Sequence, residues 1–402
     1  SDLGQYGANG IYLDETGAAG ERYCFDDRHG HEHHGIWGAS LARIMERMVA
    51  DGRKRDPDWM FAMEGCNDAI GQFADVNLVS PASAKQPGQW GANKLFRPEV
   101  FHYTFPDYIL YDGVANGTYG VSAEQVFSSA HLIGHRYDSF GQPEAVPYVA
   151  LRRRTKQILY RARFMDNTGV AADNPAVQAK TNALRDQSND RQIVNIANPE
   201  GAQGAKVTLA NGAPAELWAY YFDIEGKEGP VALTTAPGGV SFVAPVARAS
   251  TVIVARKCEP LVHVPVVEVV PGDPAVLRVT VTNTGPVPVR GRLQLEGEAA
   301  GQGTTAREIT LEPQRSAQVE LALALPPDTP RGCLTGHVLL AGGDLQVRRP
   351  VEVLVRGPFS VAGRYLAAEH AVELQLANAS EAEHRGSIRV AGVPLGPPVE
   401  RR

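Results

Sequence analysis

The sequence predicts a chain of several domains, in which part of a (β/α)8, TIM-type barrel is followed by all-β sandwich and Ig-like domains. Three observations carry this prediction. Near the start of the chain, short apolar runs end in carboxylates, and a helical pattern separates them. From Arg191 onward the helical pattern gives way to short strands split by Gly, Pro and Asn turns. A length of 402 residues leaves room for two or three domains.

The first apolar run, Ile11 to Leu13, has the length of a short buried strand and ends in Asp14, Glu15 and a glycine turn. A second run with the same order precedes Glu64 and Gly65. The segment between them places apolar residues at helical spacing, at Leu41, Ile44, Met45, Met48 and Val49. Strand, helix and strand, with an acid at the end of each strand, indicate a βαβ unit of a parallel barrel or sheet.

The rest of the first domain continues this pattern less regularly. We expect helices over 67–76, 122–137 and 149–165, and strands over 100–104 and 108–111. This gives three or four βα units, whereas a complete barrel has eight units in about 250 residues. Because the chain enters a strand almost at once, residues 1–188 are predicted to form the C-terminal half of a barrel. A small open α/β domain, complete as it stands, is the alternative.

Three β domains are expected after the barrel half. Residues 189–257 carry short strands and turns typical of a β-sandwich. Residues 258–357 have the strand count of an Ig-like sandwich, and 276–283 alternate cleanly before an Asn-Thr-Gly turn. The pattern starts again at 358–402, which is too short for another complete sandwich.

Composition excludes several classes of function. Hydrophobic residues make up 43% of the chain and charged residues 21%, which is ordinary for a globular protein. The net charge is -6 without a basic patch, so a nucleic-acid partner is not expected. No apolar run is long enough for a membrane helix. Phosphate-binding, dinucleotide-binding and nucleophile-elbow motifs are absent, and no cofactor is expected. The four cysteines form no CxxC pair and are expected to be buried free thiols.

Asp14 and Glu64 are the candidate catalytic residues. Carboxyl ends of neighbouring parallel strands meet at one edge, and two carboxylates delivered there are what cleavage of a glycosidic bond requires. The apolar residues before Glu64 would favour its protonated form and suit a general acid, while Asp14 would act as nucleophile or base. Glu15 alternates to the other side and is expected to support the substrate site. The structural alternative is that these acids cap turns or form ion pairs.

A histidine-rich stretch follows the first strand, with four histidines between His29 and His34. Histidines beside carboxylates can bind zinc, but the helical HExxH spacing is missing. A second interpretation is a loop in which His29 and His31 bind sugar hydroxyls and Trp37 stacks on a sugar face. A solvated polar loop is the third. We expect the sugar-binding loop and no metal.

Three weaker substrate-binding candidates are Asn67, which follows Glu64 closely, and His102 and Tyr103, at the end of a predicted strand. Each of them has a purely structural role as its alternative.

The stretches GIYLDE, HGH after Cys-Phe-Asp, and MFAMEG together resemble a glycoside-hydrolase-like (β/α)8 family of large bacterial proteins. The order of Asp on one strand and Glu on the next is similar to retaining α-glycosidase barrels, including the endo-α-N-acetylgalactosaminidase type. Residues 261–356 resemble the Ig-like domain that accompanies α-galactosidases. The resemblance implies a nucleophile at Asp14 and an acid/base at Glu64. The chain departs from the family pattern in lacking the first barrel strands.

The sequence therefore favours a glycoside hydrolase that acts on an oligo- or polysaccharide, with an extracellular or periplasmic location. Two alternatives remain open. One is a non-catalytic carbohydrate-binding or surface protein with a degenerate barrel. The other is a metal-dependent hydrolase that uses the His29–His34 loop.

Overall fold

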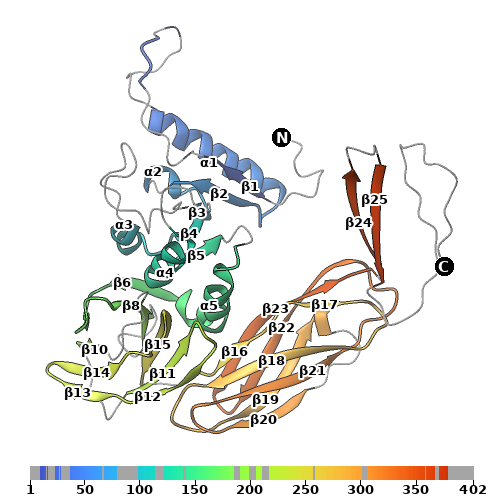
Figure 1. The fold of residues 1–402 in the computed structure, drawn as a ribbon. Helices are drawn as coiled ribbons and strands as arrows, with labels where there is room; N and C mark the ends of the chain where they lie inside the picture. The colour runs from blue at the N-terminus through green and yellow to red at the C-terminus, as the bar shows by residue number, and fades with distance from the viewer. Residues whose placement is uncertain are drawn as a thin grey trace. The chain divides into compact units, whose positions relative to one another are not determined.

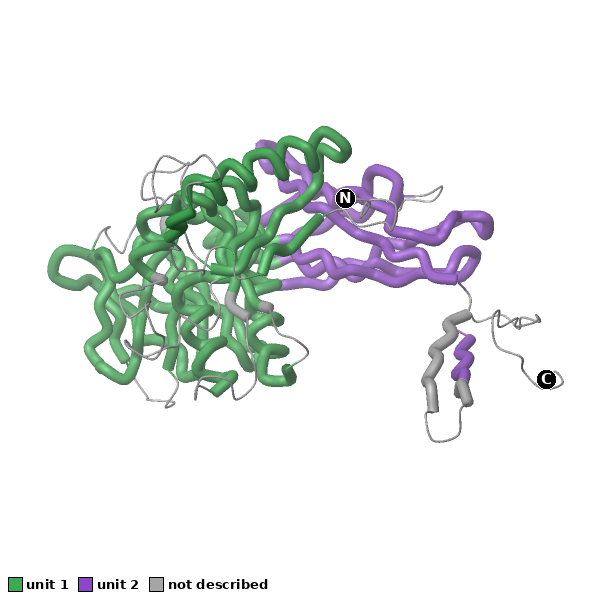
Figure 2. Tube along the Cα trace, turned by 90° about the horizontal axis from the view of Figure 1, so that it is seen from above, with its two compact units in different colours: residues 1–261, 282–288, 312–315 green, residues 262–281, 289–311, 316–402 purple. Residues whose placement is uncertain are grey.

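A computed structural model describes most of the chain. The described residues are 10–14, 16, 23–26, 28, 37–65, 68–78, 98–113, 122–138, 142–184, 191–198, 205–210, 217–256, 259–300, 306–357, 359–366 and 371–378. They belong to two compact units, shown in two colours in Figure 2. Unit 1 comprises Ser1–Leu261, Thr282–Pro288 and Glu312–Arg315, and unit 2 comprises Val262–Val281, Val289–Leu311 and Ser316–Arg402.

Unit 1 begins with a five-stranded parallel sheet (Figure 1). Its strands are β1 (Gly10–Leu13), β2 (Met60–Glu64), β3 (Val76–Leu78), β4 (Ile109–Gly113) and β5 (Arg136–Asp138). They lie in the order of the sequence, and each described pairing of neighbours is parallel. The predicted parallel α/β sheet is thus confirmed, with five strands instead of the three or four βα units expected.

Helices connect these strands along the chain. They are α1 (Trp37–Arg55), α2 (Asp68–Gly71), α3 (Pro98–Thr104) and α4 (Ala123–Ile133). In Figure 1, α1 runs across β1 and β2. Met45 of α1, Met63 of β2 and Ile70 of α2 form a buried cluster, against which Leu13 and Leu41 pack. The helical spacing of the apolar residues therefore marks the side of α1 that meets the sheet, except at Ile44, which is 53% exposed.

Two glycines shape the first two strands: Gly10 allows β1 to pair closely with β2, and Gly65 ends β2. A Cβ added at Gly10 would lie 2.8 Å from the Met60 carbonyl oxygen, so only glycine permits this approach of β1 to β2. Gly65 has a φ of 94°, a left-handed conformation that other residues rarely adopt. Its N–H donates to the Leu78 carbonyl at 2.8 Å, and β2 therefore ends at Glu64.

The expected strand over 100–104 is wrong, because this segment forms helix α3. Its β-branched and aromatic residues favour strands in isolation, but here Phe101 packs on Phe105, one helical turn later, with ring centroids 4.9 Å apart. The Thr104 hydroxyl donates to the Val100 carbonyl at 2.7 Å within the helix. Pro98, at the first helical position, supplies a favourable start.

Three of the predicted helices are shorter than expected. Ser122 caps α4 in a capping box with Gln125, and the helix ends at Gly134 in a left-handed conformation. The helix expected over 149–165 is instead α5 (Ala145–Leu159), followed by strand β6 (Ala162–Asp166). The helix predicted over 67–76 contains only the short α2 and then enters β3.

An antiparallel β-sandwich completes unit 1 and starts at β6, earlier than the change of pattern expected at Arg191. A six-stranded sheet has the order β12-β11-β15-β9-β8-β6, and a four-stranded sheet has the order β13-β14-β10-β7. The remaining strands are β7 (Val170–Ala172), β8 (Gln178–Leu184), β9 (Arg191–Ala197), β10 (Lys206–Leu209), β11 (Trp218–Asp223), β12 (Glu228–Val231), β13 (Thr234–Ala236), β14 (Gly239–Val243) and β15 (Ala249–Ala255).

Two hydrophobic clusters hold the sandwich and the helices together. The faces of the two sheets meet around residues such as Val194, Val207 and Phe242. The opposite face of the six-stranded sheet packs against α4 and α5, where Phe127 and Tyr148 join Ile253 in one buried cluster. The sandwich is therefore continuous with the helices that follow β4 and β5.

Unit 2 is a second β-sandwich. A three-stranded sheet, β16-β18-β21, and a five-stranded sheet, β17-β23-β22-β19-β20, enclose a core of Val, Leu and Ala side chains. The strands are β16 (Leu261–His263), β17 (Val267–Val269), β18 (Ala275–Asn283), β19 (Val289–Gly297), β20 (Arg307–Leu311), β21 (Arg315–Leu323), β22 (Gly332–Gly342) and β23 (Leu345–Val355), with a 3-10 turn at Glu298–Ala300. A hairpin, β24 (Phe359–Leu366) and β25 (Ala371–Asn378), follows.

No helix within the described ranges is long and apolar enough to cross a bilayer. Two of the four cysteines, Cys24 and Cys333, are among the described residues and form no disulfide. Cys333 is exposed, so the expectation of burial is wrong for this residue.

Candidate functional site

Asp14 and Glu64 lie at the same edge of the parallel sheet. Leu13 of β1 is paired in register with Met63 of β2, and each acid follows directly after its paired residue. Neighbouring strands are about 4.8 Å apart, so the two backbones deliver their carboxylates side by side. Because both strands are parallel, this is the carboxyl-terminal edge of each.

Tyr12 links the two acids. Its hydroxyl lies 3.4 Å from an Asp14 carboxylate oxygen, to which it donates a hydrogen bond. The pKa of Tyr12 is raised above its ordinary value, first by desolvation and then by the negative charge of Glu64, with further contributions from Tyr111 and Asp14. Both carboxylates therefore act on one phenol, which stays protonated as a hydrogen-bond donor.

These side chains share the sheet face opposite the face that packs on α1. Side chains alternate along a strand, so Tyr12 and Glu64 face away from Leu13 and Met63, which contact the helices. Across the sheet, Glu64 is in register with Leu78 and Leu78 with Tyr111. Tyr12 remains 44% exposed, which leaves this face accessible at the edge of the sheet.

Several of the predicted substrate residues fall outside the described part of the chain. These are Glu15, His29, His31 and Asn67, and the same holds for the side chain of Trp37, whose backbone begins α1. Within the described residues, no group of three His, Cys, Asp or Glu side chains could hold a metal ion. The histidine-rich stretch is not part of that search.

His102 and Tyr103 are not brought to the carboxylates. They lie on α3, which precedes β4 and therefore reaches its amino-terminal end. The His102 ring stacks on Phe164, with centroids 4.8 Å apart, and lies 5.3 Å from His135. Burial lowers the pKa of His102 to about 3, helped by the nearby His135 and Arg152, so its imidazole is neutral near pH 7.

Tyr12 and Tyr111 were missed as site residues in the sequence. A signal existed for Tyr12, because it stands two positions before Asp14, and residues two apart along a strand face the same side. Tyr111 could not have been found in this way, since its proximity depends on the pairing of β3 with β4.

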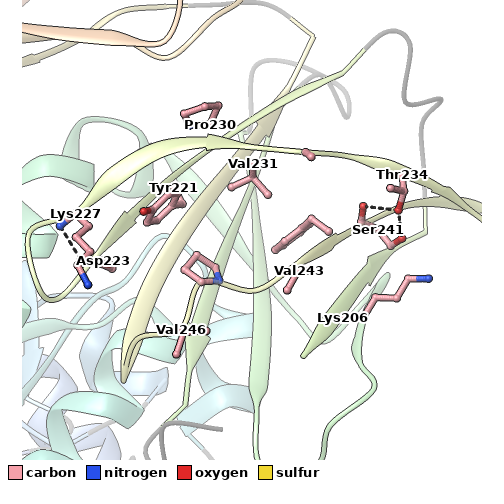
Figure 3. A pocket seen from close by; sticks show the side chains of 13 residues that line it. Lys206, Tyr221, Asp223, Lys227, Pro230, Val231, Thr234, Ser241, Val243 and Val246 are labelled. Atoms are coloured by element: carbon pink, nitrogen blue, oxygen red, sulfur yellow. Dashed lines mark hydrogen bonds between the residues drawn. The ribbon is translucent and has the colours of Figure 1, made fainter. Parts of the chain in front are cut away.

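A groove of about 520 Å³ lies in the sandwich, between the strands near β11 and those near β14 (Figure 3). Four of its polar residues are already paired with one another. The Asp223 carboxylate accepts from the Lys227 backbone N–H at 2.8 Å, and the hydroxyls of Thr234 and Ser241 lie 2.9 Å apart. The groove therefore offers few polar groups that a ligand could satisfy.

A second hollow, of about 480 Å³, is lined by residues that include His102, Ile109 and Arg136. Neither hollow includes Asp14 or Glu64 in its lining.

Three solved structures resemble parts of this chain at low identity. No family model matches the sequence, and no curated protein matches it either. A family 123 glycoside hydrolase from Clostridium perfringens matches 22% of this chain and 22% of its own, with 11% identity and a TM-score of 0.18. A Paenibacillus cycloisomaltooligosaccharide glucanotransferase matches 24% of this chain and 14% of its own, with 20% identity and a TM-score of 0.19.

The DNA glycosylase AlkC from Pseudomonas fluorescens matches to the same degree, over 25% of this chain and 31% of its own, with 19% identity and a TM-score of 0.19. Two of these three neighbours are carbohydrate-active enzymes. At these scores and coverages, however, the likenesses carry no argument about function, which must come from the site itself.

Proposed function

We propose that the chain is the part of a glycoside hydrolase that carries its carboxylate pair, with Asp14 as nucleophile or base and Glu64 as general acid. The observation that supports this most strongly is the register of β1 and β2, which delivers both acids side by side at the carboxyl-terminal edge. Glycosidic bond cleavage uses two carboxyl groups about 5 to 9.5 Å apart, and adjacent strands provide such a spacing.

The parallel sheet belongs, in this proposal, to a (β/α)8 barrel. Its strands follow one another in sequence order, whereas a doubly wound sheet reverses its order at a switch point. Helices α1 and α2 pack on one face, and the other face carries Tyr12, Glu64 and Tyr111. In a barrel this second face would be the interior, and the carboxyl-terminal edge would be the active edge. Unit 2 is proposed to be the accompanying Ig-like domain.

The chemistry would divide between the two acids. Glu64 would donate a proton to the glycosidic oxygen as the bond to the anomeric carbon breaks. Asp14 would either attack that carbon, forming a glycosyl ester that water then hydrolyses, or remove a proton from the attacking water. Glu64 returns as base in the first route and is reprotonated by solvent in the second.

Tyr12 would hold Asp14 in place. A protonated phenol that donates to a carboxylate stabilises the ionised form of that carboxylate and fixes its orientation. This suits a nucleophile or a base, both of which must be ionised before the reaction begins.

The histidine-rich stretch would supply sugar contacts. The connection from β1 to α1 spans residues 14–36 and so leaves the sheet beside Asp14. His29, His31 and Trp37 would bind and stack on the substrate, and Glu15 and Asn67 would support the site.

The test compares leaving groups on a panel of aryl glycosides. Dinitrophenolate is a good leaving group and departs from its glycosides without protonation. The leaving groups of methyl-coumarin and natural glycosides are poorer and need an acid. We expect Glu64→Gln to lose at least 100-fold more activity on the poor leaving groups than on the dinitrophenyl ones. Asp14→Asn should lose activity on both, and Asp51→Asn, an exposed acid on α1, should lose none.

A panel on which the wild type releases no aryl group, while it still binds the matching oligosaccharides, would overturn the catalytic proposal. The chain would then be a carbohydrate-binding protein with a barrel-like sheet. Equal activity of the wild type and both variants would exclude the acid pair.

A further inference from the structure

A histidine fastens helix α3 to distant parts of unit 1. His102 lies on α3, and its ring is stacked on that of Phe164 in β6, with the planes 6° apart and the centroids at 4.8 Å. The same ring lies 5.3 Å from that of His135, which follows α4 and is 1% exposed. It also forms a hydrogen bond with the backbone carbonyl of Ile133. His102 therefore joins α3 to β6 and to the end of α4.

Other side chains of α3 point outward or make local contacts. Val100 is 63% exposed and Tyr103 is 40% exposed. The Phe101 ring packs on Phe105 and Tyr108, which directly follow the helix in the sequence. The attachment of this short helix to β6 therefore depends strongly on the state of the His102 ring.

The surroundings of His102 disfavour a proton on its ring. Burial lowers its pKa to about 3, and His135 and Arg152 act in the same direction, while the hydrogen bond to Ile133 opposes them. Arg152 is 4% exposed and donates to the Gly134 carbonyl at 3.0 Å, so its charge is held in place within the core. The imidazole is therefore neutral near pH 7 as long as α3 stays attached.

Other charged groups in this region do not offset these effects. Asp166 of β6 and Lys180 of β8 form an ion pair with each other. Glu99, one turn earlier on α3, forms no ion pair with the histidine, and within the described part of the chain no other carboxylate does. The hollow that His102 lines contains three further charged residues, Arg136, Arg161 and the exposed Asp107. A proton on the buried ring would thus lack a paired carboxylate.

We propose that α3 is an acid-sensitive conformational switch, which detaches from β6 in mild acid while the rest of unit 1 stays folded. Once α3 has moved away, the His102 imidazole reaches water and binds a proton. A protonated ring cannot return to its site beside His135 and Arg152 without first losing that proton. Because His102 lines the second hollow of unit 1, detachment would open this hollow to solvent. The proposal does not depend on the glycosidase proposal.

The size of the effect follows from the two pKa values of His102. The pKa is about 3 while α3 is attached and about 6.5 when the ring is in water. Lowering the pH from 7.5 to 5.0 therefore raises the equilibrium constant for detachment about 30-fold.

The test is amide hydrogen exchange of the full chain at pH 7.5 and pH 5.0, followed by mass spectrometry, with exchange times scaled to the intrinsic rate at each pH. We expect the opening constant of the α3 amides to rise about 30-fold at the lower pH. At both pH values it should exceed the opening constant of the α4 amides, because α3 opens alone. If the α3 amides open only together with those of α4, or if their opening constant does not rise, the proposal is wrong.

Two substitutions remove the titrating group. His102→Gln keeps a donor for the Ile133 carbonyl, and His102→Phe keeps a ring that can stack on Phe164. Either variant, once thermal melting has shown it to be folded, should have nearly the same α3 opening constant at both pH values. The matched control is His337→Gln, in unit 2, which should retain the wild-type rise. A wild-type rise in the folded His102 variants would overturn the proposal, because another group would then drive the opening.

Discussion

The burial of His131 predicts that unit 1 loses stability in mild acid. His131 lies on α4 within the core, only 1% exposed, with its Nε2 atom 2.9 Å from the Ser250 carbonyl oxygen. Burial, and to a smaller extent the charge of Arg152, lower its pKa to about 3, although the Ser250 carbonyl opposes this shift. The folded protein therefore keeps this imidazole neutral at a pH where the unfolded chain already binds a proton.

The sign and size of this change in the free energy of unfolding follow from proton linkage. In the unfolded chain the histidine pKa is about 6.5. The free energy of unfolding is therefore unaffected by His131 above that pH, and it decreases as the pH falls from 6.5 toward 3, because only the unfolded chain binds the proton. At pH 5, the chain is 1.5 pH units below the unfolded value, which corresponds to about 2 kcal/mol in the free energy of unfolding. His102, with a similarly lowered pKa, adds a loss of the same sign.

The assay is urea unfolding at pH 7.5 and pH 5.0, followed by tryptophan fluorescence. All four tryptophans lie within residues 1–261, so the signal reports on unit 1. We expect His131→Gln to lose about 2 kcal/mol less than the wild type between the two pH values. His337→Gln, in unit 2, serves as the control and should behave like the wild type. Equal losses in the wild type and His131→Gln would refute the reasoning.

Two further predictions concern packing and backbone conformation. Phe127→Ala should lower the free energy of unfolding of unit 1 by about 3–5 kcal/mol, because the fully buried ring packs on Tyr137 and Tyr148. In the same urea assay the exposed Val146→Ala should change it by less than about 0.5 kcal/mol. Similar values for the two variants would count against the assigned core. Gly65→Ala should cost about 1–2 kcal/mol, because the left-handed φ of 94° penalises a Cβ, and no measurable cost would mean that β2 ends in another conformation.

The parallel α/β sheet could be predicted from the sequence because its signals are local. Strand runs ending at Asp14 and Glu64 flank apolar residues at helical spacing, and the structure pairs these strands in parallel. The capping box at Ser122 could also be predicted from the sequence, since it depends only on residues three apart.

The errors arose where packing between distant segments overrides local preference. Residues 100–104 have strand propensity, yet they form a helix whose Phe101 packs against Phe105 and Tyr108. Phe164 continued the helical spacing of α5 but belongs to β6, because β6 pairs with β8 in the antiparallel sheet. Gly134, by contrast, is a helix stop signal in the sequence. The expected helix over 122–137 extends past it, whereas α4 ends there.

For the candidate site, the sequence located the two acids but not the tyrosines around them. The contribution of Tyr111 depends on the order β2-β3-β4, which local patterns do not contain. Likewise, the predicted strand would bring His102 to the substrate site, but as part of helix α3 this residue lines the second hollow of unit 1 instead.

The most direct test of the carboxylate pair is chemical rescue of Asp14→Ala by sodium azide, with a dinitrophenyl glycoside that the wild type cleaves. Removing the side chain leaves space beside the anomeric carbon, where azide can attack in place of the carboxylate or its water. The account predicts that the variant is inactive alone, and that azide restores turnover and yields a glycosyl azide detectable by mass spectrometry. A variant that hydrolyses the substrate at the wild-type rate without azide would contradict the account, because Asp14 would then take no part in the reaction.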